Sequence, residues 1–120
     1  MIANMTPVLN ARSWCFVAVT PDRAPELLGA AIGTFREDEG VTAIVPAELA
    51  EDAPAFARIT LTVHSDLEGV GLTAAVSTAL AEAGIACNVV AALHHDHLFV
   101  PTARAEEAVE VLAELEATGS

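Results

Sequence analysis

The stretch Phe56–Val63 reads Phe-Ala-Arg-Ile-Thr-Leu-Thr-Val, and the architecture of the second half of the chain can be worked out from it. Its last three apolar residues alternate with polar ones, which is the period of a β-strand with one buried face. The strand runs into His64–Glu68, where Ser65 and Glu68 have the spacing of a capping box at a helix start. The sequence therefore predicts a strand that turns directly into a helix.

The predicted helix continues to about Ala83, and Gly84 fits the residue that ends it. Beyond it, the apolar run Ile85–Leu93 and the shorter Leu98–Val100 predict two strands. A last helix follows Pro101. Both helices carry an apolar stripe, with the following residues: Leu72, Val76, Ala79, Leu80 and Ala83 in the first, and Ala105, Ala108, Val109, Leu112 and Leu115 in the second. The predicted order for residues 56–116 is β-α-β-β-α.

The first half repeats part of this order. Residues 41–52 resemble residues 96–107, and in both Val-Pro leads into a predicted acidic, alanine-rich helix. Strands are predicted at Trp14–Val19 and Gly33–Arg36, whereas Pro21–Ala31 has room for only a helical turn or two. We expect two β-α-β-β-α halves, 1–55 and 56–120, the first with a shortened helix. Neither half has an obvious fourth strand, so a sheet shared between halves or with a second chain would cover the exposed edges.

Charge and composition exclude several classes of protein. The 120 residues include 17 acidic ones, five arginines and no lysine, which gives a net charge of −12. Such a chain repels phosphate backbones and anionic lipid, so neither nucleic acid nor membrane is an expected partner. No apolar run approaches the ~20 residues that span a bilayer, and the first residues lack the pattern of a signal peptide. We expect a cytoplasmic protein whose two cysteines, Cys15 and Cys87, are buried and reduced.

Three of the four histidines lie in His94-His95-Asp96-His97. Imidazole and carboxylate are suitable zinc ligands, but neighbours on an extended strand point to opposite faces, so only His95 and His97 would share one. The repeat puts Asp96 in register with Val41, directly after the acidic turn that ends at Gly40. A polar hairpin turn is therefore the favoured interpretation, and contact with a ligand or a metal remains open.

Several stretches together resemble one family, the small bacterial proteins built from two ACT-like halves, which are related to the ACT modules of the cytosolic arginine sensor in the animal growth-control pathway. The stretches are Thr34–Gly40, Ile59–Ser65, Val70–Ala75, Asn88–Ala92 and His95–Pro101. The resemblance spans residues 12–116. It implies an α+β, ferredoxin-like fold of duplicated ACT-like units, with an antiparallel sheet and helices on one face. It also implies a regulatory protein that binds an amino acid or a related small metabolite.

In the ACT domains that this chain resembles, the turn from the first strand into the helix forms the effector pocket together with the next strand. Carried over, the resemblance implies these ligand-binding residues: His64, Ser65, Asp66, Leu67, Val70, Gly71 and Leu72, with Asn88 and Val89 opposite. Free N–H groups at a helix start suit a ligand carboxylate, and Asp66 suits an ammonium group. Arg36 is a further candidate for a ligand carboxylate, or for an ion pair with Glu39 or Asp66.

No arrangement of nucleophile and base is supported by the sequence, so we expect no enzyme activity, no cofactor and no metal. The expected protein is a homo-oligomer, a dimer, with an amino-acid-like ligand. Two alternatives remain. One is a ligand-free interaction module that oligomerises through its sheet edges, and the other is a small metal-binding protein that uses the His-Asp-His turn.

Overall fold

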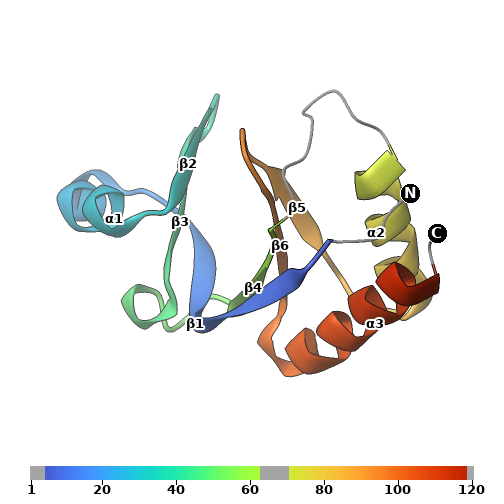
Figure 1. Cartoon of the computed structure of the whole chain (residues 1–120). Helices are drawn as coiled ribbons and strands as arrows, with labels where there is room; N and C mark the ends of the chain where they lie inside the picture. The colour runs from blue at the N-terminus through green and yellow to red at the C-terminus, as the bar shows by residue number, and fades with distance from the viewer. Residues whose placement is uncertain (1–4, 63–70, 119–120) are drawn as a thin grey trace. The chain divides into compact units, whose positions relative to one another are not determined.

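The computed structural model describes residues 5–62 and 71–118, and the chain divides into two compact units (Figure 1). The N-terminal unit is Arg12–Phe56. The C-terminal unit combines Met1–Ala11 with Ala57–Ser120, so the first residues of the chain belong with its second half. The halves 1–55 and 56–120 remain a prediction about the sequence repeat, since the compact units are interleaved along the chain.

The C-terminal unit is a four-stranded sheet with two helices. Its strands lie in the order β1-β4-β6-β5, and β1 contributes only its first part here. The elements are β1 (Pro7–Ala18), β4 (Phe56–Leu61), α2 (Gly71–Glu82), β5 (Asn88–Ala91), β6 (Asp96–Pro101) and α3 (Ala105–Thr118). Met5 and Asn10 lie opposite Thr62 and Arg58, so β1 and β4 run in opposite directions. The predicted α+β, ferredoxin-like fold is confirmed, and the fourth strand comes from the start of the chain.

The alternation that predicted β4 also orients it. Ala57, Ile59 and Leu61 are buried, whereas Arg58 and Thr60 are partly exposed on the other face. The buried face packs against α2 and α3, which lie on the same side of the sheet (Figure 1). The residues of this core are Met5, Ala57, Ile59, Leu61, Val76, Leu80, Ile85, Leu98, Val100, Ala105, Ala108 and Leu112. All residues of the two predicted helical stripes except Ala79 belong to this core or pack against it, and helices on one face of the sheet are confirmed.

The end of α2 has the predicted geometry. Gly84 has a φ of +73°, the left-handed conformation that glycine adopts without a steric penalty. The backbone N–H of Ile85 donates to the carbonyl of Leu80 at 2.9 Å, as in a Schellman motif. The guanidinium of Arg104 donates to the carbonyls of Ala83 and Gly84, both at 3.1 Å, and so satisfies acceptors that the helix end leaves free.

The N-terminal unit is smaller. Its strands β2 (Gly33–Glu37) and β3 (Gly40–Pro46) form a hairpin that pairs with the second part of β1, in the order β2-β3-β1. Gly40 directly follows the two-residue hairpin turn and has a φ of +140°. The acidic turn predicted before Gly40 is therefore present in the structure. The short helix α1 (Ala24–Ala30) covers one face of this sheet through Leu27.

The predicted acidic helix after Pro46 is replaced by a single 3₁₀ turn, Ala47–Leu49. The difference from α3 has a simple cause, because the chain has to enter β4 at Phe56 and Pro54 stands in the way of a longer helix. Within residues 5–62 and 71–118, no helix is long and apolar enough to cross a membrane.

Candidate functional site

The predicted ligand-binding residues fall into three groups. His64, Ser65, Asp66, Leu67 and Val70 lie outside the described residues. Gly71 and Leu72 are the first described residues of α2, and Asn88 and Val89 begin β5, so these four share the C-terminal unit. Arg36 lies exposed on β2 in the N-terminal unit, and the structure shows no ion pair between it and another described residue.

Strand directions divide the candidates between two ends of the sheet. In the antiparallel pair β5–β6, Asn88 lies opposite Phe99, and Ala91 lies opposite Asp96. The β5–β6 turn lies at the same end of the unit as the start of α2, whereas β5 begins near the end of that helix (Figure 1). Along the strand direction, Ala91 and Asp96 therefore lie at the same end of the unit as Gly71, whereas Asn88 lies at the other end.

Asp96 is the one buried polar residue among the described parts of the chain, with 5% of its surface exposed. It lies on the helix-facing side of the sheet, because it alternates along β6 with Leu98 and Val100, which belong to the core. No hydrogen bond joins its carboxylate to another residue that the structure describes. A buried carboxylate is costly unless a cation or donors compensate it, so this position suits a positively charged ligand group.

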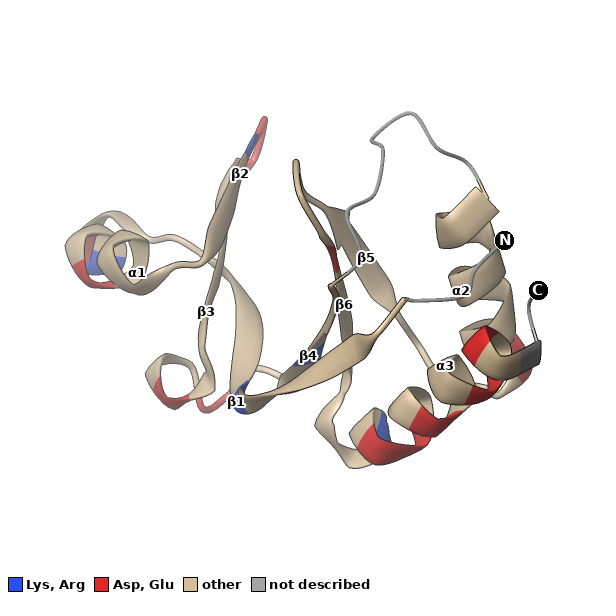
Figure 2. Cartoon of the chain, in the orientation of Figure 1, with Lys and Arg blue, Asp and Glu red and all other residues tan. Residues whose placement is uncertain are grey.

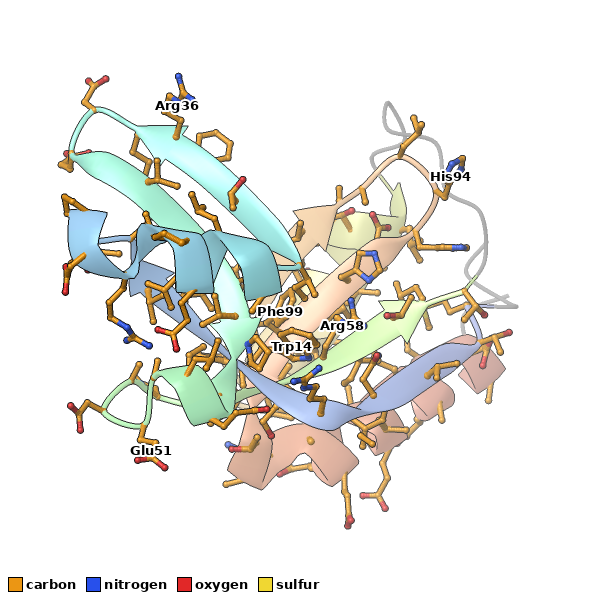
Figure 3. The ribbon with its side chains drawn as sticks, turned by 90° about the vertical axis from the view of Figure 1, so that its left-hand side faces the viewer. Trp14, Arg36, Glu51, Arg58, His94 and Phe99 are labelled. Atoms are coloured by element: carbon orange, nitrogen blue, oxygen red, sulfur yellow. The ribbon has the colours of Figure 1, made fainter. Side chains whose placement is uncertain are left out.

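The histidine cluster is divided between a turn and a strand. The backbone N–H of Ala92 donates to the carbonyl of His95 at 3.0 Å and closes the turn, where His94 is exposed (Figure 3). Asp96 and His97 lie within β6, which begins two residues before the predicted start at Leu98. In the described parts of the chain, no three His, Cys, Asp or Glu side chains are grouped so as to hold a metal ion.

A row of hydrogen bonds crosses three strands on the sheet face opposite α2 and α3. The Arg58 guanidinium donates to Oδ1 of Asn10 at 2.6 Å, and Nδ2 of Asn10 donates to the hydroxyl of Thr60 at 3.4 Å. That hydroxyl lies 3.0 Å from Nδ1 of His97. Figure 3 shows Arg58 on β4, the middle of these strands. We call the four residues Arg58, Asn10, Thr60 and His97 the polar row.

Two side chains of the polar row, Arg58 and His97, have lowered pKa values. Burial lowers the pKa of the Arg58 guanidinium. The pKa of His97 is lowered chiefly by burial and further by Arg58 and His95, while Asp96 acts in the opposite direction. The polar row was not predicted from the sequence. The polar positions of β4 were visible as one face of the strand, but the partners from β1 and β6 depend on strand order, which alternation does not reveal.

Cys15 is buried as predicted, whereas Cys87 is only partly buried. Cys15 is 1% exposed, and its Sγ donates to the carbonyls of Ala50 and Ala53 at 3.6 and 3.7 Å. Burial raises the pKa of Cys15 and also that of Cys87. Because the thiolate is the reactive form, raised pKa values make both side chains poor nucleophiles.

The N-terminal unit holds a pocket of about 390 Å³. The lining residues are Val17, Arg23, Glu48, Leu49, Ala50, Glu51, Asp52 and Ala53. Arg23 is held in place, because its guanidinium donates to Glu26 at 2.7 Å and to the carbonyl of Leu49 at 2.9 Å. Glu48 pairs with Arg12 at 3.0 Å. These internal pairs engage Arg23 and Glu48, whereas Glu51 and Asp52 leave the remaining charge of the lining acidic.

Both halves of the chain match models of the ACT domain. Residues 58–114 match the ACT domain, and residues 1–56 match a second ACT domain. A crystal structure of a protein of unknown function from Vibrio cholerae, described as a possible transport protein, is 43% identical in sequence. That similarity covers 92% of this chain and 88% of the other, with a TM-score of 0.81. No curated protein sequence matches the chain.

More distant structures share the fold. The ligand-free regulatory subunit of aspartate kinase from Thermus thermophilus has a TM-score of 0.66 at 12% identity, over 90% of this chain and 94% of that one. A structure of aspartokinase alpha and beta subunits has a TM-score of 0.60 at 15% identity, over 90% and 95% of the two chains. At these identities the similarity concerns the fold alone.

Proposed function

Because the chain belongs to the ACT-domain family, with two ACT domains in tandem, we propose that it is a regulatory protein that binds an amino acid or a related small metabolite. The observation that carries the proposal is the buried carboxylate of Asp96, at the end of the C-terminal unit where α2 begins. A free amino acid has an ammonium and a carboxylate group, and this end of the unit offers a counterpart to each.

The carboxylate of the ligand would bind at the start of α2. The described part of α2 begins at Gly71, directly after residues 63–70, and the first backbone N–H groups of a helix have no acceptor within it and favour an anion. The preceding residues His64, Ser65, Asp66, Leu67 and Val70, which lie outside the described residues, remain proposed contacts on the strength of the family resemblance.

The cationic group of the ligand would bind near Asp96, with Asp66 as a second proposed partner. Attraction between opposite charges is stronger at a buried carboxylate than at an exposed one, since water screens it less. Leu72 and Val89 pack against the core of this unit and would select the ligand by the size of its apolar part. Asn88, at the other end of β5, and Arg36, in the N-terminal unit, remain sequence predictions outside this proposed arrangement.

We also propose that the protein acts as a homodimer in the cytoplasm and has no catalytic activity of its own. The strands β5 and β2 stand at the ends of the strand order, so no further strand among the described residues pairs with their outer edges, and these edges would pair with a second copy. A net charge of −12 disfavours nucleic acid as a partner.

A thermal-shift screen tests the proposal. Wild-type protein is melted with each of the twenty amino acids at about millimolar concentration, since a ligand that binds only the folded state raises the melting temperature by mass action. We expect one chemical class of amino acid to raise it and Asp66→Ala to reduce the shift. If no amino acid raises the melting temperature, the regulatory binding role is wrong. A melting temperature that a chelator lowers in the wild type but not in His95→Ala would favour the metal-binding alternative instead.

A further inference from the structure

A groove of about 370 Å³ lies between α2 and α3 in the C-terminal unit. Ala79 and Ala83 of α2 form one wall, and Val111 and Leu115 of α3 form the other. Two alanines let the helices approach closely while leaving a hollow above them. This groove is lined by residues of α2 and α3 alone, and none of them belongs to the proposed amino-acid site.

The rim of the groove is acidic. Glu82 at the end of α2 and Glu114 on α3 line it together with the apolar walls, and both side chains are exposed. Acidic residues continue along α3, as Figure 2 shows. The basic residue next to this surface, Arg104, is held by Glu107 at 2.7 Å and by the carbonyls of Ala83 and Gly84. The groove is therefore an apolar hollow between carboxylates.

Charge determines what can occupy this groove. A second copy of the chain would bring the same carboxylates, and each copy already carries −12. In each copy, ion pairs with glutamates of the same unit engage three of the five arginines, namely Arg12, Arg23 and Arg104. Association of two copies through this face would place like charges together, which is unfavourable.

We infer that the α2–α3 groove binds a basic amphipathic helix of another protein. An apolar side chain of the partner enters the hollow between Ala83 and Leu115, and lysines or arginines beside it meet Glu82 and Glu114. This is the helix-in-groove mode of recognition, in which residues at i, i+3 and i+4 anchor the helix. Since α2 has 12 residues and α3 has 14, they span roughly 18 and 21 Å and match a partner of about three to four helical turns.

Peptide binding to the full chain tests the inference. The probe is a fluorescein-labelled synthetic peptide of about 16 residues, with leucines at i, i+3, i+4 and i+7 and lysines beside them. A second peptide has glutamate in place of each lysine. We expect saturable one-to-one binding of the basic peptide, measured by fluorescence anisotropy, and no binding of the acidic one. Absence of binding by the basic peptide overturns the inference.

Matched variants locate the binding surface. Glu82→Lys with Glu114→Lys should weaken binding at least tenfold. Glu51→Lys with Asp52→Lys changes the net charge equally in the N-terminal unit and should change binding less than twofold. Ala79→Leu fills the hollow without altering charge, keeps a good helix former, and should also weaken binding. Equal loss in both charge variants, or unchanged binding in Ala79→Leu, would show that the peptide binds by general attraction and would overturn the inference.

Discussion

The hydroxyl oxygen of Thr60 lies 3.0 Å from Nδ1 of His97, and this contact joins β4 to β6 in the polar row. Asn10 already donates to that oxygen, so the hydroxyl proton of Thr60 is free to point at His97. With Thr60 as the donor, Nδ1 of His97 is the acceptor, which requires a neutral imidazole. The arrangement favours neutral His97, in agreement with the lowered pKa of this side chain.

The protein should become less stable as the pH falls below about 6.5, the ordinary pKa of histidine. His97 has a lower pKa in the folded chain, so the unfolded chain takes up the proton first and is favoured by acid. The free energy of unfolding, measured with urea between pH 7.5 and 5.5, should decrease less in His97→Gln than in the wild type.

His94→Gln is the matched control for this experiment, because His94 lies exposed on the β5–β6 turn. We expect it to follow the wild-type pH profile. If both histidine variants have the slope of the wild type, other groups cause the acid sensitivity and His97 has no part in it.

Two neighbouring leucines of α1 should differ sharply in their effect on stability. Leu27 is 2% exposed and packs against Ala43 and Val45, whereas Leu28 is 47% exposed. Leu27→Ala should cost about 2–5 kcal/mol, because it removes buried methyl groups and leaves a cavity. Leu28→Ala should change stability by no more than about 0.5 kcal/mol. Equal urea midpoints for the two variants would show that α1 does not cover β3 as described.

Two glycine-to-alanine substitutions should have opposite signs. Gly84 has a φ of +73° at the end of α2, so Gly84→Ala should destabilise by about 1 kcal/mol. Gly29 lies within α1 with open space around it, so Gly29→Ala should stabilise by up to about 1 kcal/mol through helix propensity. Thermal unfolding of the two variants measures both effects. A stabilised Gly84→Ala variant would contradict the Schellman ending of α2.

The sequence predicted the fold well wherever local signals were strong. Alternation at Phe56–Leu61, the apolar stripes of α2 and α3 and the glycine after α2 all follow from periodicity and backbone chemistry, and each is present in the structure. The strand at Pro7–Ala11 was missed because its residues do not alternate clearly and its partner, β4, lies about 50 residues away in sequence.

The candidate site was harder to predict for a related reason. Asp96 looked like a turn residue, since it stands among histidines and is in register with Val41, directly after an acidic turn. Its burial depends on the pairing with Ala91, which extends β6 by two residues and turns the side chain toward the helices. The polar row likewise depends on strands distant in sequence, so no local pattern could reveal either feature.

The most direct test of the account is titration of the stabilising amino acid into wild-type protein, Asp96→Asn and Asp52→Asn by isothermal calorimetry. The Asp52 variant removes one exposed carboxylate in the N-terminal unit and controls for net charge. We predict that Asp96→Asn weakens binding at least tenfold, or about 1.4 kcal/mol, while Asp52→Asn binds as the wild type does. Unchanged affinity in a folded Asp96→Asn variant would contradict the assignment of the ligand to this end of the C-terminal unit.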